Sequence, residues 1–255
     1  MRNAFKLLWA PAAAAVLMAV APNLQAAPPI KNVVLVHGSW ADGSSWEKVI
    51  PLLQARGFHV VAVQNPLSSL ADDVAATNRA INMQDGPVVL VGHSYAGVII
   101  SEAGNNEKVH ALVYVAAFAP DSGQSINDLI KGFPAPPYLA TLEKDEKGFL
   151  YLSEDSIRKY FAPDLSAAEQ KVMTVTQGPW FYGCLDDKVT KAAWHDKPSW
   201  WLLTEKDQII DPRLQHGMAA ATKSKVTSVP AGHLAMLSRP AEVAAAIVSA
   251  ANSAQ

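Results

Sequence analysis

The sequence has few residues of several types, and each shortage narrows what the protein can be. A single cysteine, Cys184, excludes an intramolecular disulfide, and because its neighbours form no known nucleophile motif we expect a buried, inert thiol. Charged residues make up 17% of the chain, the formal net charge is −2, and no basic block exists to neutralise phosphates. We therefore expect no nucleic-acid partner.

Hydrophobic residues, by contrast, make up 50% of the 255 residues, enough for one sizeable domain with a full core. The start of the chain differs from the rest, because Arg2 and Lys6 precede an apolar stretch over 7–20 and Ala26 is a suitable small residue for cleavage. An uncleaved membrane anchor is the alternative, but a membrane span needs about 20 apolar residues. We predict that residues 1–26 are a secretory signal peptide, leaving a periplasmic or secreted protein without a stable membrane anchor.

Beyond residue 30, short apolar stretches with strand character alternate with stretches of helical spacing. This alternation predicts an α/β fold with a mostly parallel central sheet that helices flank on both faces. Between about 120 and 198 the sequence is richer in charge, proline and aromatics, and it resembles an insertion rather than sheet. We predict a single domain over 27–255, with a core over 30–119 and 199–255 and a cap over about 120–198. Strands are expected at 32–36, 59–63, 87–91, 109–116, 199–204 and 226–229, and helices at 45–56, 70–83, 96–103 and 240–251.

The strongest local motif is Gly-x-Ser-x-Ala-Gly over residues 92–97, which lies between an expected strand and an expected helix. This context predicts a nucleophile elbow, a strained turn where small residues let the backbone pass closely and the serine stands at a helix N-terminus. The alternative is an ordinary strand–turn–helix in which Ser94 only caps the helix. We interpret Ser94 as a nucleophile.

A serine hydroxyl needs a base to become a useful nucleophile, and His233 is the best candidate among seven histidines. It follows the expected strand at 226–229 and precedes the last helix, so the chain order is serine, acid, histidine, as expected for a nucleophile elbow fold. His195, at the end of the cap, remains a candidate for substrate contact. We expect His93 to point away from the site, His37 to shape the loop after the first strand, and His59, His110 and His216 to be surface or core residues.

The acid that orients His233 should follow the late strand at 199–204. Glu205, Asp207 and Asp211 are the candidates. Asp207 lies a short turn beyond the strand and is our prediction. Asp211 precedes a proline, which is typical of a helix start, and Glu205 is expected to be solvated.

An oxyanion formed at Ser94 would need two backbone N–H donors. We expect one from Tyr95, the residue after the nucleophile, and the other from Ser39, in the loop after the first strand.

Four segments together, 37–46, 92–97, 204–207 and 232–233, resemble one branch of the α/β-hydrolases. That branch holds bacterial esterases similar to hydroxynitrile lyases, plant methylesterases such as the salicylate-binding methylesterase, and the hydroxynitrile lyases themselves. The resemblance implies an α/β-hydrolase fold with an inserted cap and requires no metal or organic cofactor. It also implies a triad of Ser94, Asp207 and His233, with oxyanion donors from Ser39 and Tyr95.

Two positions discriminate within this branch. The plant lyases carry threonine after the histidine of the first loop, and after the catalytic histidine they carry a lysine that receives cyanide. Here these positions are Gly38 and Leu234, so both favour ester hydrolysis. Ser94 also argues against the dehalogenases, which need a carboxylate at the elbow.

The expected cap is rich in large aromatic residues, some of which should line a pocket for apolar or aromatic groups. Trp180 and Phe181 in the cap, and Gly38 and Trp40 in the first loop, are our substrate-binding candidates, although packing of the cap is the alternative for each aromatic residue. We predict a serine carboxylesterase that acts on small apolar or aromatic esters through an acyl-enzyme. Alternatives are hydrolysis of an amide, lactone or carbon–carbon bond by the same triad, and a ligand-binding receptor with a slow triad. The oligomeric state stays open.

Overall fold

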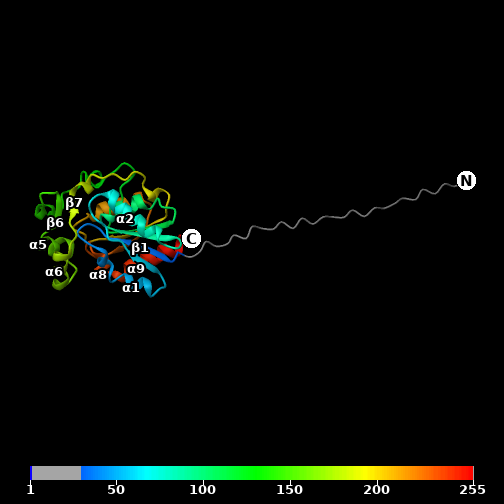
Figure 1. Cartoon of the computed structure of the whole chain (residues 1–255), viewed down its shortest axis with the longest axis horizontal. Coiled ribbons are helices and arrows are strands. Elements are labelled where there is room, and N and C mark those ends of the chain that lie inside the picture. Colours follow the sequence, from blue (N-terminus) through cyan, green and yellow to red (C-terminus); the bar gives the residue numbers. More distant parts are fainter. Residues whose placement is uncertain (2–29, 255) are drawn as a thin grey trace.

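The structure is a computed structural model that describes Met1 and residues 30–254, so the predicted signal peptide lies, apart from Met1, outside the described residues. Its centre is a six-stranded sheet in the order β2-β1-β3-β4-β8-β9, in which every neighbouring pair is parallel (Figure 1). The predicted mostly parallel sheet is therefore confirmed. The strands are β1 (Asn32–Val36), β2 (His59–Ala62), β3 (Val88–His93), β4 (Val109–Val115), β8 (Ser199–Thr204) and β9 (Lys225–Val229).

Helices cover both faces of this sheet, which explains why its central strands are almost continuously apolar and buried. Helices α2 and α3 pack together on one face, and α1 and α9 pack together on the other (Figure 1). The helices of the core are α1 (Ile50–Gln54), α2 (Leu70–Asn82), α3 (Ala96–Ala103), α7 (Pro212–Ala221), α8 (Ala235–Ser238) and α9 (Pro240–Ser253).

The predicted helix at 45–56 is wrong in its extent. The structure has a 3-10 helix, η1 (Gly43–Trp46), and then the short α1, which has Pro51 in its first turn. Proline has no N–H to continue a hydrogen-bond ladder from the preceding turn, so a helix can have Pro51 in its first turn but cannot run through it.

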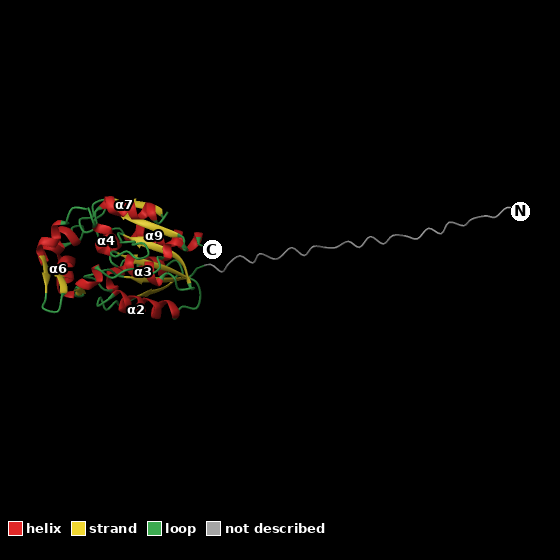
Figure 2. Cartoon of the chain, turned by 90° about the horizontal axis from the view of Figure 1, so that it is seen from above, coloured by secondary structure: helices red, strands yellow, loops and turns green. Residues whose placement is uncertain are grey.

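The cap lies between β4 and β8 in the sequence, and the part of it that contains α6 extends beyond the core (Figure 2). The expectation that this segment contains no sheet is wrong, because β5, β6 and β7 form a small antiparallel sheet. These strands are two to four residues long, too short for an alternating pattern to be recognised in the sequence. The cap elements are α4 (Ile126–Ile130), η2 (Pro137–Thr141), β5 (Leu142–Lys144), β6 (Phe149–Leu152), α5 (Glu154–Ser156), η3 (Ile157–Phe161), α6 (Ala167–Thr176), β7 (Trp180–Phe181), η4 (Tyr182–Leu185) and η5 (Ala193–His195).

The single cysteine is buried and unpaired, as predicted. Its burial raises the pKa of the Cys184 thiol to about 12, so the reactive thiolate is scarce near neutral pH. Among the residues that the structure describes, no helix is both long enough and apolar enough to cross a membrane.

Candidate active site

Ser94 lies on the tight turn between β3 and α3. Its φ of 56° is in the left-handed region, which a non-glycine residue adopts only under strain. The turn depends on two glycines without room for a side chain. A Cβ at Gly92 would lie 2.7 Å from the carbonyl oxygen of Ala96, and one at Gly97 would collide with the carbonyl oxygen of Phe118.

His233 joins the serine to a carboxylate. Its Nε2 lies 2.8 Å from Ser94 Oγ, and its Nδ1 lies 2.8 Å from Asp207 Oδ2. All three side chains are buried, so water does not compete for these hydrogen bonds. In this arrangement Nδ1 donates to the carboxylate and Nε2 is free to accept the serine proton.

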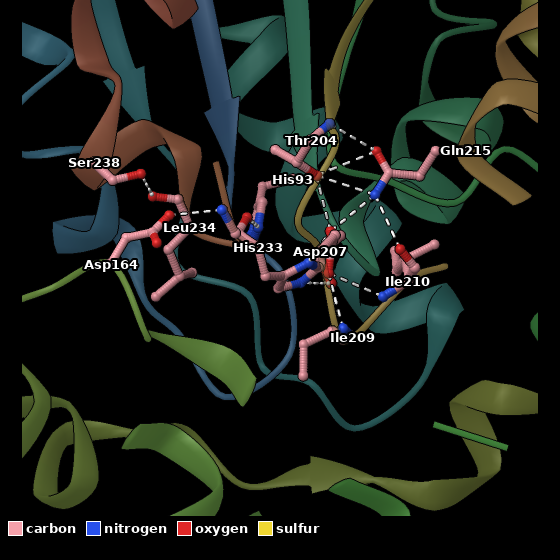
Figure 3. A network of polar contacts seen from close by, with 12 residues as sticks. His93, Asp164, Thr204, Asp207, Ile209, Ile210, Gln215, His233, Leu234 and Ser238 are labelled. Carbon is pink, nitrogen blue, oxygen red and sulfur yellow. Dashed lines mark hydrogen bonds and ion pairs between the residues drawn. The ribbon is translucent and has the colours of Figure 1, made fainter. Parts of the chain in front are cut away.

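Asp207 is held from several sides, as Figure 3 shows. Its Oδ1 accepts the backbone N–H groups of Ile209 and Ile210, at 2.8 and 3.1 Å. Its Oδ2 also accepts from Thr204 Oγ1 at 2.9 Å and from Gln215 Nε2 at 2.8 Å. These donors satisfy the buried carboxylate and fix its direction toward His233.

The two other acid candidates are occupied elsewhere. Asp211 caps α7 by accepting from the Arg213 backbone N–H at 2.8 Å and pairs with the Arg213 guanidinium. Glu205 is exposed and accepts a hydrogen bond from Ser228. Of the three candidates, only Asp207 reaches His233.

His93 does not line the cavity at Ser94, but its ring lies against that of His233. Its ring centroid is 4.6 Å from that of His233, and its Nε2 donates to the His233 carbonyl oxygen at 3.0 Å. Burial, and then the neighbouring His233, hold the pKa of His93 well below its usual range, so the ring stays neutral and supports the backbone of His233. The sequence offered no signal for this contact, because it joins residues 140 positions apart.

A second support comes from the cap. Asp164 accepts the backbone N–H of Gly232, the residue before His233, at 2.6 Å (Figure 3). This hydrogen bond was also not predictable, because it depends on how the cap folds over the core. His195, the other histidine considered for substrate contact, is largely exposed and pairs with Asp121 at 2.7 Å.

Ser39, Ser94 and Tyr95 line one cavity of about 140 Å³. Within the described residues, the backbone N–H groups of Ser39 and Tyr95 donate to no other backbone group. His37 shapes the Ser39 loop as expected, because its ring bonds Gly38 O and Asn65 N, each at 2.9 Å.

Gly38 is not among the residues that line this cavity, so the cavity gives no support to its expected role in substrate binding. A Cβ at Gly38 would lie 2.7 Å from Ser94 Cβ and 2.9 Å from the His93 carbonyl oxygen. The glycine is therefore needed for close packing against the nucleophile turn, and it leaves no open space there.

Trp40 and Trp180 both line the cavity, and their rings meet edge to face with centroids 5.3 Å apart. Trp40 has a φ of 56°, and its Nε1 donates to the Leu150 carbonyl oxygen at 3.0 Å, which fixes the ring against the cap. Phe181, the other candidate, packs against Phe149 and is not part of the lining, since neighbouring residues of β7 point to opposite sides. Lining residues that the sequence did not single out include Phe118, Ile126, Asn127, Ile130, Leu139, Leu150, Leu185 and Ile209.

A larger hollow of about 310 Å³ lies between α6 and the loop that contains η1. It shares Trp40 with the smaller cavity, but Ser94 and Tyr95 are not part of its walls. The smaller cavity is therefore the one that can hold a reacting group. Among the described residues, no cluster of three or more His, Cys, Asp or Glu side chains could hold a metal ion.

Comparisons with known proteins place the chain among the α/β-hydrolases. The model of the α/β-hydrolase family matches residues 33–246. A probable hydrolase of Phoma sp. is 25% identical over 82% of this chain and 93% of its own length. Salicylic acid-binding protein 2 of Nicotiana tabacum is 31% identical over 44% of this chain and 50% of its own length. A solved pyrethroid hydrolase superposes with a TM-score of 0.78 and 21% identity, over 88% of this chain and 98% of that one.

The chain belongs to the α/β-hydrolase family, and it is a hydrolase. The predicted resemblance is confirmed at this level, since the relatives include plant methylesterases and bacterial esterases.

Proposed function

We propose that the protein is a serine carboxylesterase that hydrolyses small apolar or aromatic esters through Ser94, His233 and Asp207. The observation that carries the proposal is the unbroken hydrogen-bonded series from Asp207 through His233 to Ser94 Oγ, which ends at a cavity lined by apolar side chains. The names of its relatives, among them methylesterases of Arabidopsis thaliana and a pyrethroid hydrolase of Sphingobium wenxiniae, support ester hydrolysis in general.

The proposed reaction has two halves. Ser94 Oγ attacks the ester carbonyl while His233 Nε2 takes its proton, and Asp207 stabilises the imidazolium that forms. The oxyanion is held by the N–H groups of Ser39 and Tyr95. His233 then protonates the leaving alcohol and an acyl-enzyme remains. Water, activated by His233, attacks the acyl carbon, and the acid leaves as Ser94 regains its proton.

The lining of the cavity supports an uncharged substrate. Apart from Ser39 and Ser94, the side chains with polar atoms along it are Tyr95, Asn127, Tyr138 and the indoles of Trp40 and Trp180, and no charged side chain of the described residues lines it. A charged group would lose its hydration there without gaining a counter-ion. Trp40, Trp180 and Tyr138 offer ring faces and edges, which favour an aromatic or compact apolar group.

The same lining argues against a cyanohydrin lyase. Leu234 is buried directly after His233, and within the part of the chain that the structure describes no lysine or arginine side chain lines the cavity to receive cyanide. We therefore expect no useful release of cyanide from mandelonitrile. The rivals that keep the triad are hydrolysis of an amide, lactone or carbon–carbon bond, and a receptor that retains its product.

A panel of p-nitrophenyl esters, assayed with wild-type protein and Ser94→Ala, tests the proposal. We expect repeated turnover of short and aromatic esters by the wild type and a loss of about 10⁴-fold or more in Ser94→Ala. A single burst with retained product would favour a receptor. Cyanide release well above the Ser94→Ala background, with little esterase activity, would overturn the reaction type.

We also propose that the protein is exported to the periplasm or beyond. The proposal rests on the charged, apolar and small-residue pattern of residues 1–26. N-terminal sequencing of the mature protein should begin at Ala27. A chain that keeps Met1 in the membrane fraction would instead indicate an uncleaved anchor.

A further inference from the structure

A buried acid that the proposed mechanism does not use lies next to the oxyanion donor Tyr95. Asp73 is in the first turn of α2 and is fully buried. Its Oδ2 accepts from the Tyr95 hydroxyl at 2.9 Å, and its Oδ1 accepts from the Leu67 backbone N–H at 2.8 Å. Its neighbour Asp72 is the exposed acid of the same turn. The position of Asp72 is explained by its contact with the N-cap residue Ser69 and by the helix dipole, which favours an acid there.

Helix capping therefore does not explain Asp73. Burial raises the pKa of its carboxyl to about 6, so an ionised Asp73 is held at some cost to stability. The charge has no cationic partner among the groups that influence its pKa, which instead include the acids Asp72 and Asp187. Its hydrogen-bond partners are the Tyr95 hydroxyl and the Leu67 N–H, so the carboxylate of Asp73 holds the segments to which Tyr95 and Leu67 belong.

Two groups of Tyr95 hold the nitrogen side of the reactive peptide: its carbonyl oxygen, which accepts from Val98 N at 2.9 Å, and its side chain. The peptide between Ser94 and Tyr95 is held at its oxygen end, because Ser94 O accepts from Gly97 N and Phe118 N at 3.0 and 3.1 Å. Tyr95 is the N-cap residue of α3, and its side chain makes no capping hydrogen bond. Its ring is fully buried, packs 5.1 Å from the Trp180 ring, and ends at Asp73.

Leu67 connects the same carboxylate to the wall of the cavity. This residue has a φ of 58°, and while its N–H binds Asp73, its carbonyl oxygen accepts from the Phe181 N–H at 2.9 Å. Phe181 belongs to β7 together with the cavity-lining Trp180. One carboxylate thus holds both the serine turn and the strand of the cap that closes the cavity.

We propose that Asp73 is a positioning residue for ester hydrolysis, which fixes the direction of the Tyr95 amide N–H toward the oxyanion by holding the Tyr95 hydroxyl. This inference rests on the esterase function proposed above. It predicts that the buried hydroxyl of Tyr95 stabilises the transition state more than it strengthens substrate binding, although it does not touch the ester.

The test is Tyr95→Phe, which keeps the ring and removes the hydroxyl, with its hydrogen bond to Asp73 and its contact with the Cys184 thiol. We expect kcat to fall about tenfold with KM within about twofold, a fraction of what losing a whole oxyanion donor costs. The matched control is Tyr114→Phe, which removes another buried tyrosine hydroxyl, bonded to Ser101 at 3.0 Å and outside the cavity. The control should keep its kcat.

Two substrates distinguish a loss of oxyanion positioning from a general loss of active-site structure in Tyr95→Phe. A thionoester carries sulfur in place of the carbonyl oxygen, and sulfur is a weaker hydrogen-bond acceptor. If Asp73 acts through the oxyanion donor, Tyr95→Phe should slow the oxygen ester more than the thionoester. An equal fall for both substrates, or no fall for either, overturns the proposal.

The rate at which an aryl phosphonate labels Ser94 tests the esterase function and the positioning role of Asp73 separately. In this step Ser94 Oγ bonds to phosphorus, the aryl oxide leaves, the serine proton passes to His233, and the phosphoryl oxygen takes the oxyanion position. Wild-type protein that is labelled without turning over esters would refute the esterase function alone. Equal labelling rates for wild type and Tyr95→Phe would refute the role of Asp73. Should Tyr95→Phe not fold, the near-isosteric Asp73→Asn takes its place, with the same slower labelling expected.

Discussion

At the scale of single residues, the same chemical group has different roles according to its surroundings. Asp207 and Asp211 lie four positions apart after β8, yet one is buried against His233 and the other caps α7 at the surface. The hydrogen bonds of Asp207 to Ile209 N and Ile210 N turn its second oxygen toward the histidine. Local geometry, not residue type, therefore decides which acid can orient the base.

Asp207→Asn should abolish most esterase activity, by about 10⁴-fold in kcat. An asparagine can place its amide NH₂ against Nδ1, which would put the proton of His233 on Nε2, where the nitrogen could no longer accept from Ser94. Asp211→Asn is the matched control, since asparagine is also a good helix cap and the Asp211–Arg213 ion pair is partly exposed. We expect it to change kcat less than twofold, and a reversal of the two results would make Asp211 the acid.

Sequence alone leads to Ser94 and His233, because the motif at 92–97 and the position of His233 before the last helix are local signals. It also ranks Asp207 first among three acids. It does not reveal Asp73, whose place in the first turn of a helix resembles ordinary dipole compensation. It also does not show where Phe181 and Gly38 lie, because the side to which a short strand points and the space around a glycine are tertiary properties.

At the scale of elements, the strands of the core and the position of the cap were predictable, and the small sheet inside the cap was not. Strands buried on both faces leave long apolar runs in the sequence, as β3 and β4 do. The strands β5 to β7 are too short to leave such a signal, and they are stabilised by contacts with one another and with the core. Turns with close backbone contact differ again. They require glycines, and the sequence shows these glycines but not the contacts that require them.

Gly97→Ala should destabilise the protein by about 1–3 kcal/mol or more, as overpacking of a rigid core does. The added Cβ would collide with the Phe118 carbonyl oxygen, which cannot move aside easily because it is a backbone atom. Gly217→Ala is the control, because Gly217 lies in α7 and, apart from the neighbouring backbone of the helix itself, no atom lies within 4 Å of the added Cβ. It should stabilise the protein by about 0.5–1 kcal/mol. Urea unfolding of both variants measures the difference, and equal effects would contradict the close packing of the turn.

At the scale of the whole molecule, the cap and the core are joined at several points around the site. Leu67 O accepts from Phe181 N, Asp164 accepts from Gly232 N, and Lys48 pairs with Glu169 of α6 at 2.6 Å. The first two contacts hold residues next to Trp180 and His233, so closure of the cap also orders the reactive groups. The exposed Lys48–Glu169 pair contributes little by itself. Such long-range contacts are why fold class follows from sequence and the assembled site does not.

The buried Asp73 should make the free energy of unfolding of the whole molecule depend on pH, and the substitution Asp73→Asn should remove this dependence. Its pKa rises from 3.8 to about 6 on folding because burial disfavours the charged form. The folded state therefore holds the proton more tightly, so the contribution of Asp73 to stability is full below about pH 3.8 and is lost as pH rises through about 6. The shift corresponds to a loss of up to about 3 kcal/mol.

Asparagine at position 73 has no proton to lose, so Asp73→Asn should not show this part of the pH dependence. Its unfolding free energy, minus that of the wild type, should increase by up to about 3 kcal/mol between about pH 4 and pH 7. Urea unfolding of both proteins across this range gives the difference directly, and groups that titrate alike in both cancel. Asp72→Asn is the control, because Asp72 is exposed and its pKa is lowered by Ser69, which gives the opposite sign. A difference that stays flat for Asp73→Asn would mean that the carboxylate is not held at a cost, and the case for a positioning role would lose its energetic support.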